Sequence, residues 1–201
     1  MSVFEKSWAQ VWTDLGLAPS SGLFDQLLGA YSQPQRHYHT KQHLAECLSL
    51  FDHVQHLAAH PGEVAVALWF HDAIYDIKGT SNEQLSADWA LSVLRDANAD
   101  TRVQERVERL ILASKHDATP TDSDQQLLVD IDLSILGANP ERFAEYDRQV
   151  RAEYSWVPDF IYKMKRKAVL KAFLARPFIY NTNYFREHYE QQAHINLIAV
   201  S

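Results

Sequence analysis

Apolar residues recur every three or four positions along most of the chain, and this spacing predicts amphipathic helices. Only 6 Gly and 7 Pro interrupt the 201 residues, so few breaks separate the helices. Ser21 and Thr40 are expected to cap the second and third helices, and Pro61 is expected to begin the fourth. Asn139-Pro140 is another start signal. The predicted helical faces are Phe4–Leu15, Leu23–Tyr31, Leu44–Val54, Val64–Phe70, Leu85–Val93, Val103–Ser114, Phe143–Tyr154, Asp159–Ala175 and Asn183–Leu197.

The segment Leu127–Leu136 fits two periodicities. Its apolar residues alternate with Asp130, Asp132 and Ser134, as in a β-strand, but they also form one face of a helix. Gly137 suits a helix end, and no other segment offers a partner for a single strand. We therefore interpret the segment as helix, and we expect an all-α fold with one helical domain over residues 1–201.

His71 and Asp72 follow directly on the apolar run Val64–Phe70. A helix this apolar should bury most of its surface, and a buried carboxylate is costly unless it is paired or bound to a metal. Imidazole nitrogen and carboxylate oxygen are ligands for hard or borderline divalent cations. The pair therefore predicts a metal site within a helical core.

Composition narrows the classes of function. The chain has 19 basic and 26 acidic residues, and its net charge of -7 argues against binding nucleic acid through bulk electrostatics. Cys47 is the only cysteine, which excludes an intrachain disulfide and thiolate zinc motifs. No secretory signal opens the chain, and no apolar stretch approaches the roughly 20 residues that span a bilayer. We expect a cytoplasmic protein that does not associate with membranes.

The order His43, His71-Asp72, Asp132 resembles the signature of the HD-domain superfamily of metal-dependent phosphohydrolases. The flanking segments Arg36–His43, Leu68–Asp76 and Asp130–Gly137 also look like one branch of that superfamily. The resemblance extends over roughly residues 31–197, with the motifs in a core of about 31–175. It implies an HD-type helical bundle whose different helices contribute the four motif residues.

The resemblance implies that His43, His71, Asp72 and Asp132 hold one divalent metal ion. Two imidazoles and two carboxylates suit Mn, Fe, Co, Ni, Zn or Mg, and they leave coordination positions open for water and a phosphate oxygen. Because imidazole binds a metal only when it is neutral, loss of the metal at acid pH is predicted. Asp130 competes for the last ligand position, and the resemblance favours Asp132.

Asp72 is expected to take part in catalysis as well as in metal binding. Some nucleotidases of the superfamily use an acidic residue three positions after this Asp as proton donor, but here that position is Tyr75. Asp76 and Glu83 are therefore the candidates for a general acid that acts through a water molecule. Glu83 is equally well explained by the electrostatics of a helix start after Ser81.

Four further residues are candidate substrate contacts. Arg36 and His39 lie close in sequence to the first metal-binding histidine, and Lys115 and His116 follow an apolar helical face. In the superfamily, a histidine in the place of His116 often serves a second metal or the substrate, but the helix dipole also favours a histidine at a helix end. His116 is the only histidine between the His-Asp pair and the last Asp, so one metal is expected rather than two.

These residues predict a metal-dependent phosphohydrolase that uses a metal-activated water on a small, nucleotide-like phosphomonoester or phosphodiester. One alternative is a non-catalytic sensor of nucleotides or anions, suggested by Tyr75 in place of the acid. A second is an HD-type di-iron oxygenase, which the scarcity of histidines disfavours. The expected partner is a small phosphorylated substrate.

Overall fold

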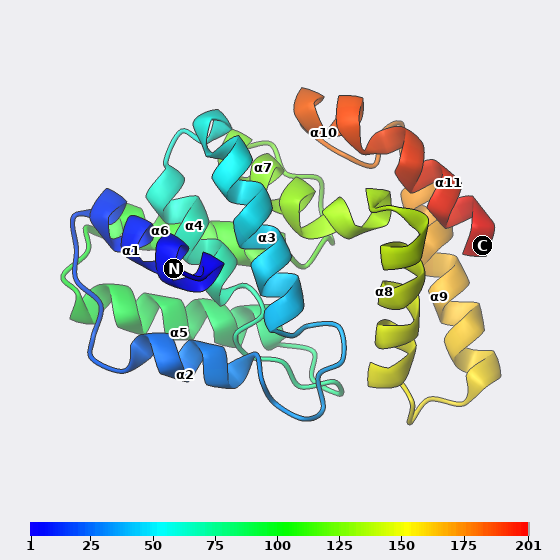
Figure 1. The fold of residues 1–201 in the computed structure, drawn as a ribbon, viewed down its shortest axis with the longest axis horizontal. Coiled ribbons are helices and arrows are strands. Elements are labelled where there is room, and N and C mark those ends of the chain that lie inside the picture. The colour runs from blue at the N-terminus through cyan, green and yellow to red at the C-terminus, as the bar shows by residue number, and fades with distance from the viewer. Residues whose placement is uncertain (201) are drawn as a thin grey trace. The chain divides into compact units, whose positions relative to one another are not determined.

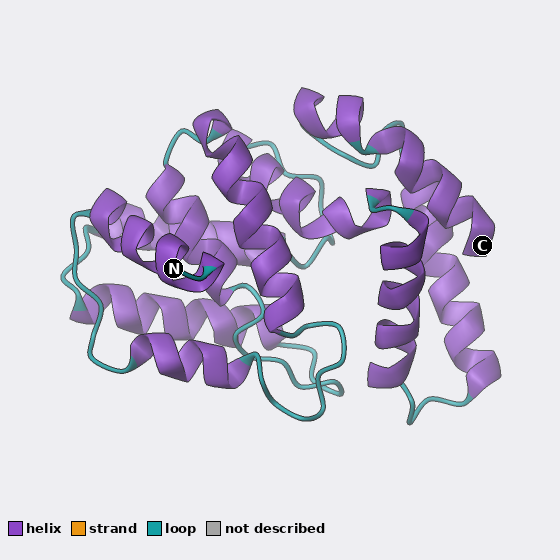
Figure 2. Ribbon diagram, viewed as in Figure 1, coloured by secondary structure: helices purple, strands orange, loops and turns teal. Residues whose placement is uncertain are grey.

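The computed structural model describes residues 1–200, and their regular secondary structure is entirely helical (Figures 1 and 2). The predicted all-α fold is confirmed. Among these residues, no helix is long and apolar enough to cross a membrane. The elements are α1 (Val3–Leu15), α2 (Leu23–Ala30), α3 (Lys41–Val54), η1 (Gln55–Leu57), α4 (Pro61–Phe70), α5 (Asn82–Asp96), α6 (Thr101–Ala113), α7 (Ser123–Asp132), η2 (Leu133–Gly137), α8 (Pro140–Glu153), α9 (Asp159–Leu174), α10 (Asn183–His188) and α11 (Glu190–Val200).

The chain divides into two compact units, Met1–Ile131 and the part from Asp132 onward. The first unit contains α1 to α6 and all of α7 except its last residue. The second contains η2 and α8 to α11. The expectation of one domain over residues 1–201 stays a prediction.

Helix α4 is the centre of the first unit, where it contacts α1, α3, α5 and α6 (Figure 1). Nine of its ten residues, Gly62–Phe70, are buried. Because Val64–Phe70 is apolar on every side of the helix, α4 needs neighbours all around it. The one charged residue, Glu63, accepts two hydrogen bonds of 2.6 Å from the guanidinium of Arg106 on α6. The segment that leads to His71 is therefore enclosed.

An aromatic cluster fixes the rotation of α4 about its axis. The ring of Trp69 lies 5.0 Å from that of Trp8, and 6.0 and 5.9 Å from those of Phe4 and Phe24 (centroid distances). All three partners come from α1 and α2. His71 is two residues further along and about 200° further round a helix, so it faces away from this cluster.

Three helix starts agree with the sequence. The hydroxyl of Thr40 accepts a hydrogen bond from a backbone N–H at the start of α3, and Pro61 is the first residue of α4. The side-chain oxygen of Asn139 accepts the backbone N–H of Arg142 at 2.9 Å, which caps α8. The predictions for α3, α4 and α8 are confirmed because a cap depends on residues close to it in sequence.

Two details of the predicted helices are wrong: the capping residue of the second helix and the continuity of the last one. Helix α2 begins after Gly22 rather than Ser21, since Gly22 has a φ of 80°, a left-handed conformation that favours glycine. The helix expected over 183–197 is two helices, α10 and α11, separated at Tyr189. At this break the backbone of Tyr189 approaches Gly137 so closely that an added Cβ there would lie 2.7 Å from the Tyr189 carbonyl oxygen.

The segment Leu127–Leu136 is helical, as predicted, but it changes from α-helix to 3₁₀-helix after Asp132. Within the second unit, the side-chain amide of Asn196 on α11 donates to the carbonyl oxygens of Leu136 and Ala138, at 2.8 Å each. These bonds satisfy carbonyl groups that have no helical partner at the end of η2.

Candidate metal centre

A buried arginine holds the C-terminal end of α4. The guanidinium of Arg36, which is 4% exposed, donates to the carbonyl oxygens of Asp72 at 2.6 Å, Ala73 at 2.9 Å and His39 at 3.1 Å. Carbonyl groups at a helix C-terminus lack helical partners and carry partial negative charge, so a cation stabilises them. Arg36 thereby fixes the turn that carries His71 and Asp72.

Helix α7 is anchored at the opposite end of α4. The carboxylate of Asp124, in the first turn of α7, accepts the backbone N–H groups of Ala59 at 2.7 Å and His60 at 3.0 Å, just before α4 begins. At the other end of α7, a carboxylate oxygen of Asp132 lies within 4.8 Å of ring nitrogens of His43 and His71.

His43 of α3 and His71 meet in the interior, where they are 2% and 1% exposed. Their Nε2 atoms are 3.1 Å apart, and Oδ2 of Asp72 lies 3.1 Å from Nε2 of His71 and 3.5 Å from Nε2 of His43. Nδ1 of His71 lies 2.8 Å from the carbonyl oxygen of Leu68, which only accepts, so Nδ1 carries a proton. In the metal-free protein Nε2 of His71 donates a hydrogen bond to Asp72 when the imidazole is protonated, and it supplies a lone pair to a metal ion when the imidazole is neutral.

The carboxyl group of Asp72 is stabilised in its charged form. Burial by itself raises the pKa of Asp72, but the positive charges of His71, His39 and His43 and a hydrogen bond from His71 together hold the pKa well below its ordinary value. Asp72 is therefore ionised at neutral pH, which is the form that binds a metal.

The donor atoms of His43, Cys47, His71 and Asp132 all lie within 4.8 Å of one another. We call these residues the four-residue cluster. The first three are buried and Asp132 is half-buried. Asp132 is where the division into units falls, but it is the last residue of α7, which otherwise belongs to the first unit. The cluster could hold one metal ion, and the Asp72 carboxylate lies directly beside its two imidazoles.

Asp130 and Asp132 leave α7 on opposite sides. Asp130 is 0% exposed and lies two residues, or about 200° of helix, before Asp132. Of the two carboxylates, the one in the four-residue cluster is that of Asp132. The geometry therefore favours Asp132 as the ligand.

The distances suit a single metal ion. With ligand atoms about 2.1 Å from an ion, neighbouring ligands are about 3.0 Å apart in octahedral geometry and about 3.4 Å apart in tetrahedral geometry. The distances among His43, His71 and Asp72 are 3.1, 3.1 and 3.5 Å. Imidazole nitrogen, carboxylate oxygen and thiolate sulfur are all established donors to divalent transition metals. The residues present therefore fit one divalent ion.

His39 lies beside this centre. Its ring stacks on that of Tyr75 at a centroid distance of 4.2 Å and lies 6.0 Å from the ring of His43. The charge of His39 is also one of the causes that lower the pKa of Asp72. A contact between His39 and substrate stays a prediction, but the structure places its ring next to His43, a candidate metal ligand.

The two candidate general acids lie after α4. Asp76 is exposed in the connection to α5, and its carboxylate accepts the backbone N–H of Lys78 at 3.0 Å. Glu83 is the second residue of α5 and is half-buried. The turn around Asp76 explains its acidic side chain structurally, so a catalytic role for Asp76 or Glu83 stays a prediction.

Lys115 and His116 follow the end of α6. Lys115 is exposed, whereas His116 is half-buried and has a φ of 55°, a left-handed conformation that non-glycine residues rarely adopt. Neither residue belongs to the four-residue cluster. Their predicted contacts with substrate stay predictions.

The sequence interpretation missed two features of the centre. Cys47 does not belong to a multi-cysteine motif, but its spacing of four residues from His43 was a usable signal, because residues at i and i+4 share a helix face. Arg36 was expected at a phosphate, whereas the structure uses its guanidinium to hold backbone carbonyls. No local pattern in the sequence predicts that contact, and a phosphate contact for Arg36 stays a prediction.

No protein-family model, curated protein or solved structure matches this chain. The resemblance to the HD-domain superfamily therefore rests on the residues themselves: the order His43, His71-Asp72, Asp132 and the flanking segments.

Proposed function

We propose that this protein is a metal-dependent phosphohydrolase of the HD type that cleaves a small, nucleotide-like phosphomonoester or phosphodiester. The observation that carries the proposal is the convergence of two buried imidazole nitrogens and the Asp72 carboxylate within 3.1–3.5 Å. Polar groups are costly to bury without compensation, so such a convergence in an apolar helical core is best explained by a bound cation.

A bound ion would supply a water of lowered pKa and would polarise a phosphoryl oxygen. His43 and His71 are almost completely buried, so they hold the interior side of the site. The side chain of Asp72 is 17% exposed and Asp132 is half-buried. We infer that substrate reaches the site from the side of these carboxylates, since that side is accessible to solvent.

His39 is the best-placed candidate for binding the phosphate. Its ring is half-buried, is held by stacking on Tyr75, and would donate a charge-assisted hydrogen bond when protonated. In the hydrolysis, the oxygen of water bonds to phosphorus, the bond to the leaving oxygen breaks, and that oxygen takes up a proton. Asp76 and Glu83 remain our candidates for delivering this proton through a water molecule.

The test combines metal analysis with a panel of phosphate esters. We expect about one transition-metal ion per chain and hydrolysis of at least one ester with Mn, Co, Ni or Zn. Asp72→Ala should lower turnover on the order of 100-fold or more and reduce the metal content. Asp52→Ala is the matched control, because Asp52 is 43% exposed and pairs with Lys6. A protein that binds none of these metals, and stays inert with all of them, would overturn the proposal.

A second candidate function is a nucleotide or anion sensor. The observation that favours it is Tyr75, an aromatic residue that stacks on His39 at the position of the superfamily's proton donor. A sensor would bind nucleotides or inorganic phosphate, and its thermal unfolding temperature would rise with ligand concentration, but it would show no turnover. Binding without turnover in the metal-loaded protein would decide for the sensor.

Three further expectations accompany the proposal: a cytoplasmic location, a small phosphorylated substrate and no bulk binding of nucleic acid. A di-iron oxygenase would need ligands for two ions, whereas the four-residue cluster offers ligands for one. Metal analysis also separates these two enzymes, because the oxygenase would bind two iron ions per chain.

A further inference from the structure

The sulfur of Cys47 lies among the nitrogen and oxygen donors of the four-residue cluster. Its Sγ atom is 3.8 Å from both ring nitrogens of His43 and within 4.8 Å of the donor atoms of His71 and Asp132. In a tetrahedral site with metal–sulfur and metal–nitrogen distances of about 2.3 and 2.1 Å, the sulfur and nitrogen atoms are about 3.6 Å apart. The position of Sγ therefore suits a ligand of the same ion.

We propose that Cys47 binds the metal directly as a thiolate and makes the site select a zinc-like borderline ion over Mg²⁺ and Mn²⁺. The inference rests on the metal site of the proposed function, but it does not depend on the hydrolase activity. When the metal–sulfur bond forms, the S–H bond breaks and the proton leaves to solvent. Thiolates bind Zn²⁺ and Co²⁺ well and are poor ligands for Mg²⁺, which prefers oxygen.

The position of Cys47 distinguishes a ligand from an ordinary core cysteine. A buried free cysteine usually packs as a small apolar residue. Cys47 is 2% exposed, but it lies one turn after His43 on the same face of α3, and this face is directed at polar donors. An apolar residue gains little from such neighbours, whereas a thiolate completes a four-ligand set.

Cobalt substitution of the full chain tests the proposal. Co²⁺ bound to a thiolate shows a sulfur-to-cobalt charge-transfer band in the near ultraviolet, and Cys47 is the only cysteine, so the band can arise only from this residue. We expect the band to grow to saturation at one equivalent of Co²⁺. Cys47→Ser should abolish it and lower Zn²⁺ affinity by on the order of 10–100-fold, but change Mn²⁺ affinity by less than about 3-fold.

The possible outcomes separate this inference from the proposed function. Stoichiometric Co²⁺ binding to the unmodified protein without the band overturns the role of Cys47 and leaves the metal site in place. No binding of Co²⁺ or Zn²⁺ overturns both proposals. The band without hydrolysis of any phosphate ester supports Cys47 as a ligand and counts against the hydrolase. The decisive spectrum uses the unmodified chain, so it does not depend on whether the Cys47→Ser variant folds.

Discussion

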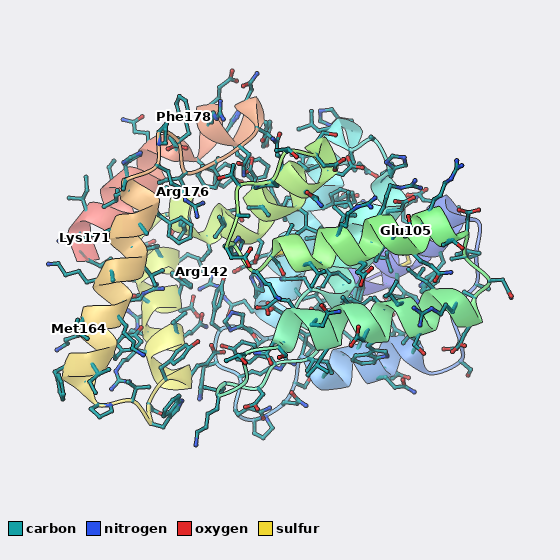
Figure 3. The ribbon with its side chains drawn as sticks, turned by 180° about the vertical axis from the view of Figure 1, so that it is seen from behind. Glu105, Arg142, Met164, Lys171, Arg176 and Phe178 are labelled. Atoms are coloured by element: carbon teal, nitrogen blue, oxygen red, sulfur yellow. The ribbon has the colours of Figure 1, made fainter. Side chains whose placement is uncertain are left out.

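Helices α4 and α9 differ in how much of their surface is buried. Nine of the ten residues of α4 are buried, whereas Leu170 is the one buried residue among the sixteen of α9. Helix α9 instead exposes Phe160 (74%) and Met164 (63%) among lysines; Met164 and Lys171 are labelled in Figure 3. The sequence predicts both helices, but α4 is enclosed on every side whereas α9 is mostly exposed.

The difference explains where chemistry can occur. A charge in the interior must be paired or bound, because the low dielectric constant makes an unsatisfied polar group costly. Glu63 of α4 is therefore paired with Arg106, and Asp72 faces two imidazoles. On α9, by contrast, the charged side chains are exposed except for that of Arg166, which is 15% exposed and pairs with Asp147. The exposed residues of α9 should therefore have weaker effects than the enclosed residues of the first unit.

The largest expected difference between α4 and α9 is in the free energy of unfolding lost when an apolar side chain is removed. Phe70→Ala should lower the free energy of unfolding by about 4 kcal/mol, since Phe70 is 0% exposed and its removal leaves a cavity. Phe160→Ala, the same substitution on α9, should cost less than about 0.5 kcal/mol. Urea unfolding followed by circular dichroism measures both. Equal costs would show that Phe160 is covered in solution.

Breaking an ion pair should likewise cost more stability at α4 than at α9. Arg106→Met leaves Glu63, whose side chain is 7% exposed, without its partner, and should cost about 2–3 kcal/mol. This is at the lower end for a buried pair because Arg106 itself is 31% exposed. Lys163→Met breaks the exposed pair with Asp159 and should leave the free energy of unfolding almost unchanged, because solvent screens the pair. The double variant Glu63→Gln/Arg106→Met should recover part of the loss, and no recovery would contradict the explanation.

The acid stability of the metal-free protein should depend on Asp72. Its folded-state pKa lies below the ordinary value of 3.8, so the ionised carboxylate stabilises the fold above about pH 4 and this contribution is lost as the pH falls further. Asp72→Asn should therefore flatten the decline in stability below pH 4, by roughly 1–3 kcal/mol. Asp159→Asn on α9 is the control and should leave the acid-unfolding curve unchanged, because its pair with Lys163 is exposed to solvent. An unchanged curve for Asp72→Asn would contradict the prediction.

Helix caps should show the smallest contrast. Thr40→Ala in the first unit and Asn139→Ala in the second should each cost about 1 kcal/mol, since a cap acts locally. Trp8, Trp12, Trp69 and Trp89 report on the first unit, and Trp156 reports on the second. If both variants shift one common fluorescence transition, the single-domain expectation is supported. If each shifts only the transition of its own unit, the expectation is wrong.

The sequence predicted most helices because periodicity and capping are properties of neighbouring residues. Thr40, Pro61 and Asn139 mark their helices without any help from distant contacts. The break at Tyr189 was missed because its cause is a close approach to Gly137, more than 50 residues earlier in the chain. Local signals contain no information about such an approach.

Periodicity and capping along the chain were enough to predict the helical class, and the resemblance to the HD-domain superfamily predicted His43, His71, Asp72 and Asp132 as donor residues. The contact of Cys47 with three of these donors, and the hold of Arg36 on the turn at the end of α4, appear only in the three-dimensional structure. Both depend on how each helix is rotated about its axis and on which neighbours enclose it. These are set by packing between distant segments, which a local pattern does not record.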